Sequence, residues 1–564
     1  NNNSSRFGKW LQLAIDRQGM DISECSVSEY LLELTRVVAP GAKERNYHVF
    51  HQLTHCRESK ELKSLRLSEP RQYRYLSGCQ EYAPGIDDSK FFEDLGDAFT
   101  ALSISPETQQ DIYGVVAGIL TLGNCSFVEV GDASKLSDEA PLRDVAQQFG
   151  VDQVALQEAM LTRKIRVGQE VTETPRTPTQ AGETRDALAR LLYGCLFKWL
   201  VNWINKTMAQ GGADNDLLLG MLDIAGFETF ATNSLEQLHI NLSNEYLQQH
   251  FNRHVFRLEL EVYAAEGVPA PDATFVDNSD IVSLIDGKGG VLRLLDDEVS
   301  IPRASDQSFV AKVYKAHENS GRFMKSKMKS ASEFGIWHFA GEVTYTCDGF
   351  LAKNVDRPPE EAPCLFGSST RTLLRELGAM AKENATDAGT GRGKKKSTVS
   401  SKLSTRLTAL MEKIGSSQPH FVRCVKPNLE KRPDTFTATL VMEQLKCSGV
   451  LDAVTLRQAG YATRMGFKEF VSRYRVLFPL AHRSDICRSE FRDESSIKAF
   501  LGELAKDKSI DTETDVAIGK TKVFLKAKLV SVLDGKRELY FTGAVLRMQR
   551  VFRGMKVRRL ILQV

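Results

Sequence analysis

Paired cysteines, long apolar runs and a dominant charge are all missing from this chain of 564 residues. Its ten cysteines stand singly, without C-x-x-C spacing, which argues against a zinc site or a disulfide framework and favours a reducing, intracellular setting. No apolar run approaches the roughly 20 residues that cross a bilayer, so no transmembrane segment is expected. The formal net charge is only +2, so no overall attraction to nucleic acid or membranes is expected.

The remaining composition is that of a globular protein with several lobes. Charged residues make up 26% of the chain and apolar residues 42%, as in soluble globular proteins. At 564 residues the chain is too long for one hydrophobic core, so smaller lobes around a main core are expected.

Three apolar segments are expected to form strands. LLLGMLD (Leu217–Asp223) and FVRCV (Phe421–Val425) are continuous apolar runs that end at turn residues. Such runs are typical of strands buried on both faces, as in the parallel part of an α/β sheet. FGIWHFAGEVTY (Phe334–Tyr345) alternates irregularly around a glycine and predicts a strand or hairpin outside that layer.

Helical spacing of apolar residues predicts one long helix over Asn233–Tyr263, a segment without proline or glycine. Ser404–Ile414 is expected to form a second helix, and residues 538–564 a basic amphipathic one. Between them, Asn384–Ser401 consists mostly of Gly, Lys, Ser and Thr, which predicts a flexible loop.

The segment DIAGFE contains candidate residues for phosphate chemistry. Asp223 ends an apolar strand, where α/β sheets bind ligands, and its carboxylate can hold Mg²⁺ through water. Gly226 has no side chain, so its N–H can approach a terminal phosphate, and Glu228 would lie just beyond it. For an isolated D-x-x-G the alternative, an ordinary strand-to-helix turn, is the commoner one.

The first residues, NNNSSRFGK, carry a matching set. Ser5 offers a hydroxyl to Mg²⁺, and Ser4 offers one that can relay a proton from an attacking water. Asn1 and Asn3 can donate to phosphate oxygens. Arg6 is the expected partner of Glu228, because a guanidinium pairs with a carboxylate bidentately. On these residues alone, a frayed, solvated terminus is the simpler reading.

The rest of the chain reverses that preference, because the two segments resemble switch I and switch II of the myosin motor. The usual form of the first is N-x-N-S-S-R-F-G-K, and Phe7, Gly8 and Lys9 favour myosin over kinesin. DIAGFE is followed by NSLEQLHINLSNEYLQQHFNRHVF, which is similar to a myosin relay helix. RDALARLLYGCLFKWLVNWIN, PHFVRCVKPN, QLKCSGVLDAVTLRQAGYATRMGF and IGKTKVFLK continue the resemblance in order, over essentially the whole chain.

This resemblance implies a P-loop NTPase-type α/β core, a mixed central sheet with surrounding helices, followed by a converter and a lever helix. The sheet is expected to be incomplete, because a myosin has further strands and a G-x-x-x-x-G-K-[ST] loop before switch I. The implied divisions begin with switch I and the upper actin-cleft subdomain (1–222), followed by switch II with the relay helix and lower subdomain (223–384) and a basic actin-binding surface loop (385–401). A core strand with the reactive-thiol helices (402–464), the converter (465–537) and a lever helix with an IQ motif (538–564) complete the chain.

The function implied is that of an actin-based cytoskeletal motor that hydrolyses ATP with Mg²⁺, located in the cytoplasm on the actin cytoskeleton. The only GKT, Gly519–Thr521, has Thr514 where the first loop glycine is required, so it is a decoy. Residues 1–564 alone are therefore expected to lack ATPase activity and to fold only in part. The alternative is a non-catalytic module that binds actin and calmodulin or a light chain.

Two surfaces outside the switch loops are expected to bind partners. Lys394, Lys395 and Lys396 lie in a loop that, by position, resembles the one bridging the actin cleft, although a solvated linker is the simpler reading of its composition. Met548–Arg558 resembles an IQ motif, which a calmodulin-like chain grips. Its expected light-chain contacts are Met548, Gln549, Phe552, Arg553, Gly554 and Arg558.

Two positions depart from the family pattern or leave it unsettled. Arg457 stands where conventional myosins have the more reactive of two thiols, whereas Cys447 retains the other. The acidic or phosphorylatable residue of the actin-facing loop corresponds to Glu170, Thr172, Glu173 or Thr174. Myosin class, cargo, light-chain identity and oligomeric state cannot be inferred from these residues.

Overall fold

A computed structural model describes most of the chain. The described residues are 5–41, 44–83, 85–167, 170–209, 217–269, 277–325, 332–355, 359–387, 398–430, 432–448, 450–451, 454, 460–477, 494–505 and 514–561. They divide into two units. Unit 1 comprises residues 1–241, 286–335 and 344–408, and unit 2 comprises residues 242–285, 336–343 and 409–564.

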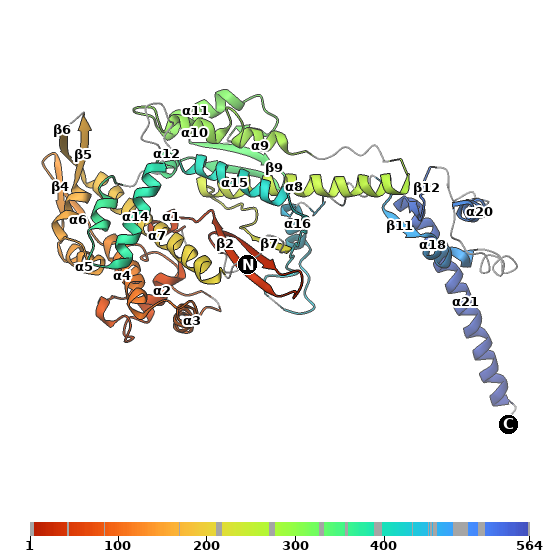
Figure 1. The fold of residues 1–564 in the computed structure, drawn as a ribbon. Helices are drawn as coiled ribbons and strands as arrows, with labels where there is room; N and C mark the ends of the chain where they lie inside the picture. The colour runs from red at the N-terminus through yellow and green to blue at the C-terminus, as the bar shows by residue number, and fades with distance from the viewer. Residues whose placement is uncertain are drawn as a thin grey trace. The chain divides into compact units, whose positions relative to one another are not determined.

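A three-stranded sheet in unit 1, in the order β2-β1-β7, positions the two predicted loops (Figure 1). Strand β1 (Gly8–Ile15) pairs antiparallel with both β2 (Ile22–Tyr30) and β7 (Leu217–Asp223). Lys9 lies opposite Asp223, so the beginning of β1 meets the end of β7. The loops that precede β1 and follow β7 therefore leave the sheet at the same place.

The strand predicted over Leu217–Asp223 is confirmed with the same bounds, but its expected surroundings are wrong. It pairs antiparallel with β1, not in a parallel layer, and most of its side chains are exposed. An apolar run specifies a tendency to be buried but not the direction of the neighbouring strand. Gly220 has a separate role, because a Cβ there would lie 2.0 Å from the ring of buried Trp10.

The strand predicted over Phe421–Val425 is not formed. The segment is irregular, and Val422 is 86% exposed. A strand requires a hydrogen-bonded partner, whereas the Gln444 side chain binds both the N–H and the carbonyl of Lys426, at 2.8 and 2.9 Å. Local β propensity favoured a strand here, and side-chain hydrogen bonding by α16 (Ala438–Cys447) holds the end of the segment instead.

The predicted long helix is α8 (Leu235–Glu266), which extends three residues beyond the expected end. Gly267 adopts φ +70°, a conformation that favours glycine and ends helices. The second predicted helix is α15 (Val399–Gly415), and α14 (Thr372–Asp387) ends inside the predicted loop, most of which lies outside the described residues.

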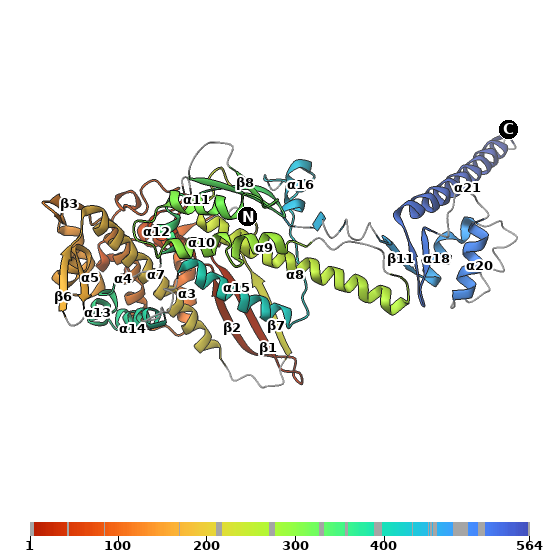
Figure 2. The ribbon, with the colours of Figure 1, turned by 90° about the horizontal axis from the view of Figure 1, so that it is seen from above.

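The predicted hairpin is also confirmed. It consists of β9 (Glu333–His338) and β10 (Gly341–Thr346), which join β8 (Phe323–Lys325) in a sheet separate from β2-β1-β7 (Figure 2).

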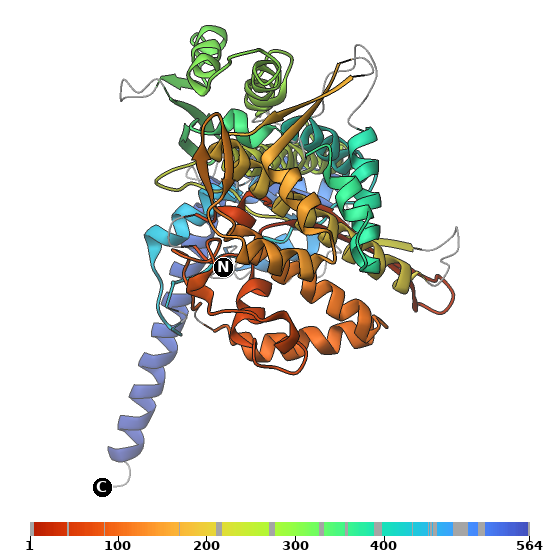
Figure 3. The ribbon, with the colours of Figure 1, turned by 90° about the vertical axis from the view of Figure 1, so that its left-hand side faces the viewer.

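The main core of unit 1 is helical (Figure 3). Helix α4 (Pro106–Gly123) is buried along most of its length and packs near α7 (Pro178–Met208) and α14. Thr177 starts α7 with a capping box, in which its side chain accepts from Gln180 N–H and Gln180 accepts from Thr177 N–H. Helix α7 also contacts β2, which connects this helical core to the β2-β1-β7 sheet.

Unit 2 contains a small lobe and a long helix. The lobe has a sheet in the order β11-β13-β12, formed by Thr463–Gly466, Lys522–Leu525 and Val516–Ile518, with α18 (Phe467–Tyr474) and α20 (Glu494–Leu504) around one apolar core. Helix α21 (Ala527–Ile561) includes the predicted C-terminal helix. Gly519–Thr521 forms the turn between β12 and β13 and precedes a strand, whereas a phosphate-binding loop precedes a helix, which agrees with its prediction as a decoy.

Candidate functional site

The two loops at the common end of β1 and β7 are joined by the predicted ion pair between Arg6 and Glu228. Arg6 Nη1 donates to Glu228 Oε1 at 2.8 Å, and Nη2 donates to Oε2 at 3.4 Å. The side chains are only 12% and 11% exposed, so solvent screens the pair weakly. The guanidinium therefore presents its two-nitrogen end to the carboxylate, the geometry that makes such pairs strong.

A second carboxylate, which the sequence analysis did not identify, binds the same guanidinium. Arg6 Nε donates to Glu33 Oε2 at 2.5 Å, and the N–H of Glu33 donates to the carbonyl of Arg6 at 3.0 Å. Burial alone would lower the pKa of Arg6, but the Glu33 and Glu228 carboxylates outweigh it and raise that pKa. Arg6 is thus held as a cation between two acids.

Helix α8 fixes the backbone of Glu228. Asn241 Oδ1 accepts from the N–H of Glu228 at 2.8 Å, and Asn241 Nδ2 donates to its carbonyl at 2.9 Å. Asn241 Nδ2 also lies 2.9 Å from the Tyr345 hydroxyl, and Gln237 Nε2 donates to Glu228 Oε2 at 3.3 Å. A shift of the first turns of α8 would therefore move Glu228 with it.

The other predicted residues lie around this pair. Asp223 is exposed at the end of β7, with Lys9 Nζ 3.7 Å from its carboxylate, and Ser5 is exposed before β1. Gly226 is exposed, and a Cβ built on it would meet no atom within 4 Å. Asn1, Asn3 and Ser4 lie outside the described residues.

These donors fit Mg²⁺ and a phosphate in part. In the described ranges no three His, Cys, Asp or Glu side chains converge to hold a metal by themselves. Mg²⁺ usually keeps several waters and binds one or two carboxylates plus substrate phosphates, for which Asp223 and the Ser5 hydroxyl are suitable oxygen donors. The open space at Gly226 leaves its backbone accessible to a phosphate.

The predicted partner surfaces have different outcomes. Lys394, Lys395, Lys396 and Arg457 lie outside the described residues. The candidate regulatory positions Glu170–Thr174 lie on one strand, β6 (Glu170–Pro175), which pairs with β5 (Thr162–Val167). Cys447 is the last residue of α16.

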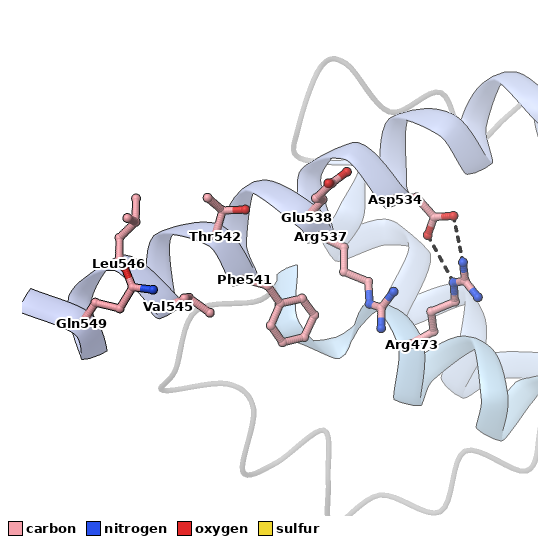
Figure 4. Close-up of a pocket in the computed structure, with 9 residues that line it drawn as sticks. All are labelled: Arg473, Asp534, Arg537, Glu538, Phe541, Thr542, Val545, Leu546 and Gln549. Carbon is pink, nitrogen blue, oxygen red and sulfur yellow. Dashed lines mark hydrogen bonds and ion pairs between the residues drawn. The ribbon is translucent and has the colours of Figure 1, made fainter. Parts of the chain in front are cut away.

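The IQ-like segment is helical and open. Met548 and Phe552 on α21 are each 70% exposed, and Arg553 and Arg558 are also exposed. Gln549 lines the end of a groove of about 550 Å³ along α21, whose apolar wall is Phe541, Val545 and Leu546 (Figure 4). The other end of this groove is marked by an ion pair between Arg473 and Asp534 at 2.8 Å. In the sequence, the only signal for this groove is the apolar spacing upstream of Met548, which lies outside the IQ-like motif.

Glu33 and Asn241 could have been suspected only in part from the sequence. Glu33 is an acid in the apolar stretch YLLEL, and Asn241 is a polar residue on the apolar side of a helix pattern. Neither feature identifies the residue that is contacted, because each contact joins segments that only folding brings together.

Comparison with known proteins finds a match to one family model and similarity to several proteins that are much longer than this chain. The family model for the myosin head (motor domain) matches residues 1–526. Among similar proteins of Arabidopsis thaliana, Myosin-14 is 37% identical over 575 residues, covering 100% of this chain and 37% of that protein. Myosin-7 is 38% identical, covering 95% of this chain and 30% of that protein, and Myosin-11 is 37% identical, covering 99% and 36%. The chain thus spans about a third of the length of these relatives.

Proposed function

The chain belongs to the myosin head (motor domain) family, and on that basis we propose that it forms part of an actin-activated, Mg²⁺-dependent ATPase motor. The observation that carries the proposal is the Arg6–Glu228 ion pair, which joins the loop before β1 to the loop after β7. These are the loops whose sequences resemble the two nucleotide switches. We propose that the protein is located in the cytoplasm, on the actin cytoskeleton.

The proposed chemistry relies on positioning. Phosphoryl transfer needs an aligned water and stabilised charge more than covalent help from the protein. Arg6 and Glu228 would close the site behind the terminal phosphate and exclude bulk water. The N–H of Gly226 would donate to a phosphate oxygen, and the Ser4 hydroxyl would relay the proton of the attacking water.

Mg²⁺ would be held by the Ser5 hydroxyl and, through water, by Asp223, and it would neutralise charge on the phosphates. Asn1 and Asn3 would donate to phosphate oxygens. Because Asn241 and Gln237 bind Glu228, closure of the loop after β7 would be transmitted to the start of α8. In the proposed motor, α8 is the relay helix, residues 465–537 are the converter and residues 538–564 are the lever.

We assign the partners as follows. Lys394, Lys395 and Lys396 would attract acidic actin, a contribution that salt weakens. The IQ-like helix would bind calmodulin or a light chain through Met548, Gln549, Phe552, Arg553, Gly554 and Arg558.

Three features of α21 support a light chain as its partner. Phe541, Val545, Met548, Phe552 and Met555 repeat at spacings of four and three residues, and all are exposed large apolar residues. Leu539–Ile561 contains six basic residues and no acidic one. An acidic, apolar-lined partner complements this helix, whereas a second copy would be repelled.

The same helix also favours a second candidate, a non-catalytic module that binds actin and a light chain. Two titrations on the full-length protein separate the candidates: a fluorescent ATP analogue with and without Mg²⁺, and calmodulin. Steady-state ATPase is then measured with and without actin filaments. Mg²⁺-dependent nucleotide binding with actin-stimulated turnover is expected for the motor. Calmodulin binding without nucleotide binding would support the module. The absence of both nucleotide binding and calmodulin binding would contradict both candidates.

A further inference from the structure

Arg6 has a second carboxylate partner, Glu33, besides Glu228 on the loop after β7. We propose that Glu33 is a positioning residue: it anchors the Arg6 guanidinium by its Nε edge, so that the two Nη nitrogens face Glu228. The inference rests on the proposed ATPase function and adds a residue to it. It assigns to Glu33 no contact with nucleotide.

The division of the guanidinium between the two acids supports this role. Glu33 accepts a hydrogen bond from Arg6 Nε, with 2.5 Å between nitrogen and oxygen. Glu228 accepts one from each Nη nitrogen, with nitrogen–oxygen distances of 2.8 and 3.4 Å. A planar guanidinium with one edge held has little freedom to rotate its other edge. Glu33 therefore determines which nitrogens Glu228 meets.

Glu33 is suited to be the fixed member because Arg36 holds its carboxylate. Arg36 Nε donates to Glu33 Oε2 at 3.1 Å and Nη2 donates to Oε1 at 3.3 Å. Arg36 is only 4% exposed, and its Nη1 donates to the carbonyl of Arg45 at 2.8 Å. The Tyr47 hydroxyl donates to the carbonyl of Glu33 at 2.9 Å.

The backbone before Glu33 is shaped to bring it to Arg6. Leu31, just after β2, adopts φ +55°, which is uncommon for a bulky residue and is kept only where the surroundings enforce it. The chain then turns so that the N–H of Glu33 donates to the Arg6 carbonyl at 3.0 Å. Arg6 is thus bound to Glu33 by both backbone and side chain.

The consequence concerns the step at which Glu228 moves away. Without Glu33, a poorly exposed Arg6 would lose its only carboxylate and would have to reorient before the next closure. With Glu33 in place, the Arg6 guanidinium keeps a counter-charge and stays oriented for Glu228. We expect Glu33 to affect hydrolysis rather than nucleotide binding, and to act only through the Arg6–Glu228 pair.

The test compares four forms of the full-length protein with wild type: Glu33→Gln, Glu228→Gln, Glu33→Gln/Glu228→Gln and Asp111→Asn. Asp111 is the matched control, because it lies on α4 of unit 1 and also accepts from an arginine, Arg371, at 3.0 Å. Single-turnover quench measures ATP hydrolysis, a fluorescent analogue measures nucleotide binding, and thermal melting measures folding.

Glu33→Gln should slow hydrolysis by about 10- to 100-fold, as small misplacements in active sites do, with nucleotide binding unchanged. The double variant should be no slower than Glu228→Gln alone, and Asp111→Asn should match wild type. Additive losses in the double variant, or a wild-type rate in Glu33→Gln, would overturn the inference. If Glu33→Gln fails to fold, Glu33→Asp replaces it, and a wild-type rate with this shorter carboxylate would also count against positioning. An inactive wild type would instead refute the proposed function.

Discussion

Exchanging the charges of Arg6 and Glu228 should restore only part of the activity that each single exchange removes. The reason is that the Arg6 guanidinium lies between two carboxylates, 2.5 Å from Glu33 and 2.8 Å from Glu228. Arg6→Glu combined with Glu228→Arg re-creates one attraction. It also places a new carboxylate at position 6 against Glu33, which repels it.

The magnitude follows from the weak exposure of the pair. Unit charges about 4 Å apart interact by about 4 kcal/mol at an effective dielectric constant of about 20. Removing one partner of a buried pair costs about 3–5 kcal/mol, and about 1.4 kcal/mol is a factor of ten in rate. If the pair is complete only in the closed site, each single exchange should slow hydrolysis by at least about 100-fold.

The decisive variant adds Glu33→Gln to the exchanged pair. In that background the substitution removes a like charge and should raise the hydrolysis rate, whereas in the wild type it should lower the rate. Single-turnover quench with separate measurement of nucleotide binding reports both effects, and thermal melting excludes unfolded variants. Full recovery by the double exchange with Glu33 intact, or a slower rate on adding Glu33→Gln, would refute the electrostatic reasoning.

Three further predictions concern other parts of the chain. Neutralising Lys394–Lys396 should weaken actin activation most at low ionic strength and leave basal ATPase nearly unchanged. If variant and wild type bind actin with equal affinity at every salt concentration in co-sedimentation, the loop is only a linker. Phe552→Asp should reduce calmodulin affinity in a titration without lowering the melting temperature, because the side chain is exposed, and Met548→Asp should act alike. Burial alone would raise the pKa of Glu236, but Lys353, 2.8 Å away, outweighs it and lowers that pKa below 4.5. Stability from this pair should be present above pH 4.5 and lost as the pH falls through the lowered pKa. Glu236→Gln should therefore reduce the fall of the melting temperature at acidic pH.

The sequence alone was sufficient for features that depend on local pattern. Leu217–Asp223, Asn233–Tyr263 and Phe334–Tyr345 formed the predicted strand, helix and hairpin, because apolar spacing and turn residues specify each element locally. The chemistry of the Arg6–Glu228 pair could also be inferred, because the charges sit in two segments of recognisable pattern.

Tertiary structure decided the features that depend on a partner distant in sequence. Whether Phe421–Val425 became a strand depended on a neighbour to hydrogen-bond with, and the direction of β7 depended on β1. Glu33 and Asn241 gained their roles because the turn after β2 and the start of α8 bring them to Arg6 and Glu228. Residue type and spacing record what a side chain can bind, but only the folded backbone sets the few ångströms within which a hydrogen bond or ion pair forms.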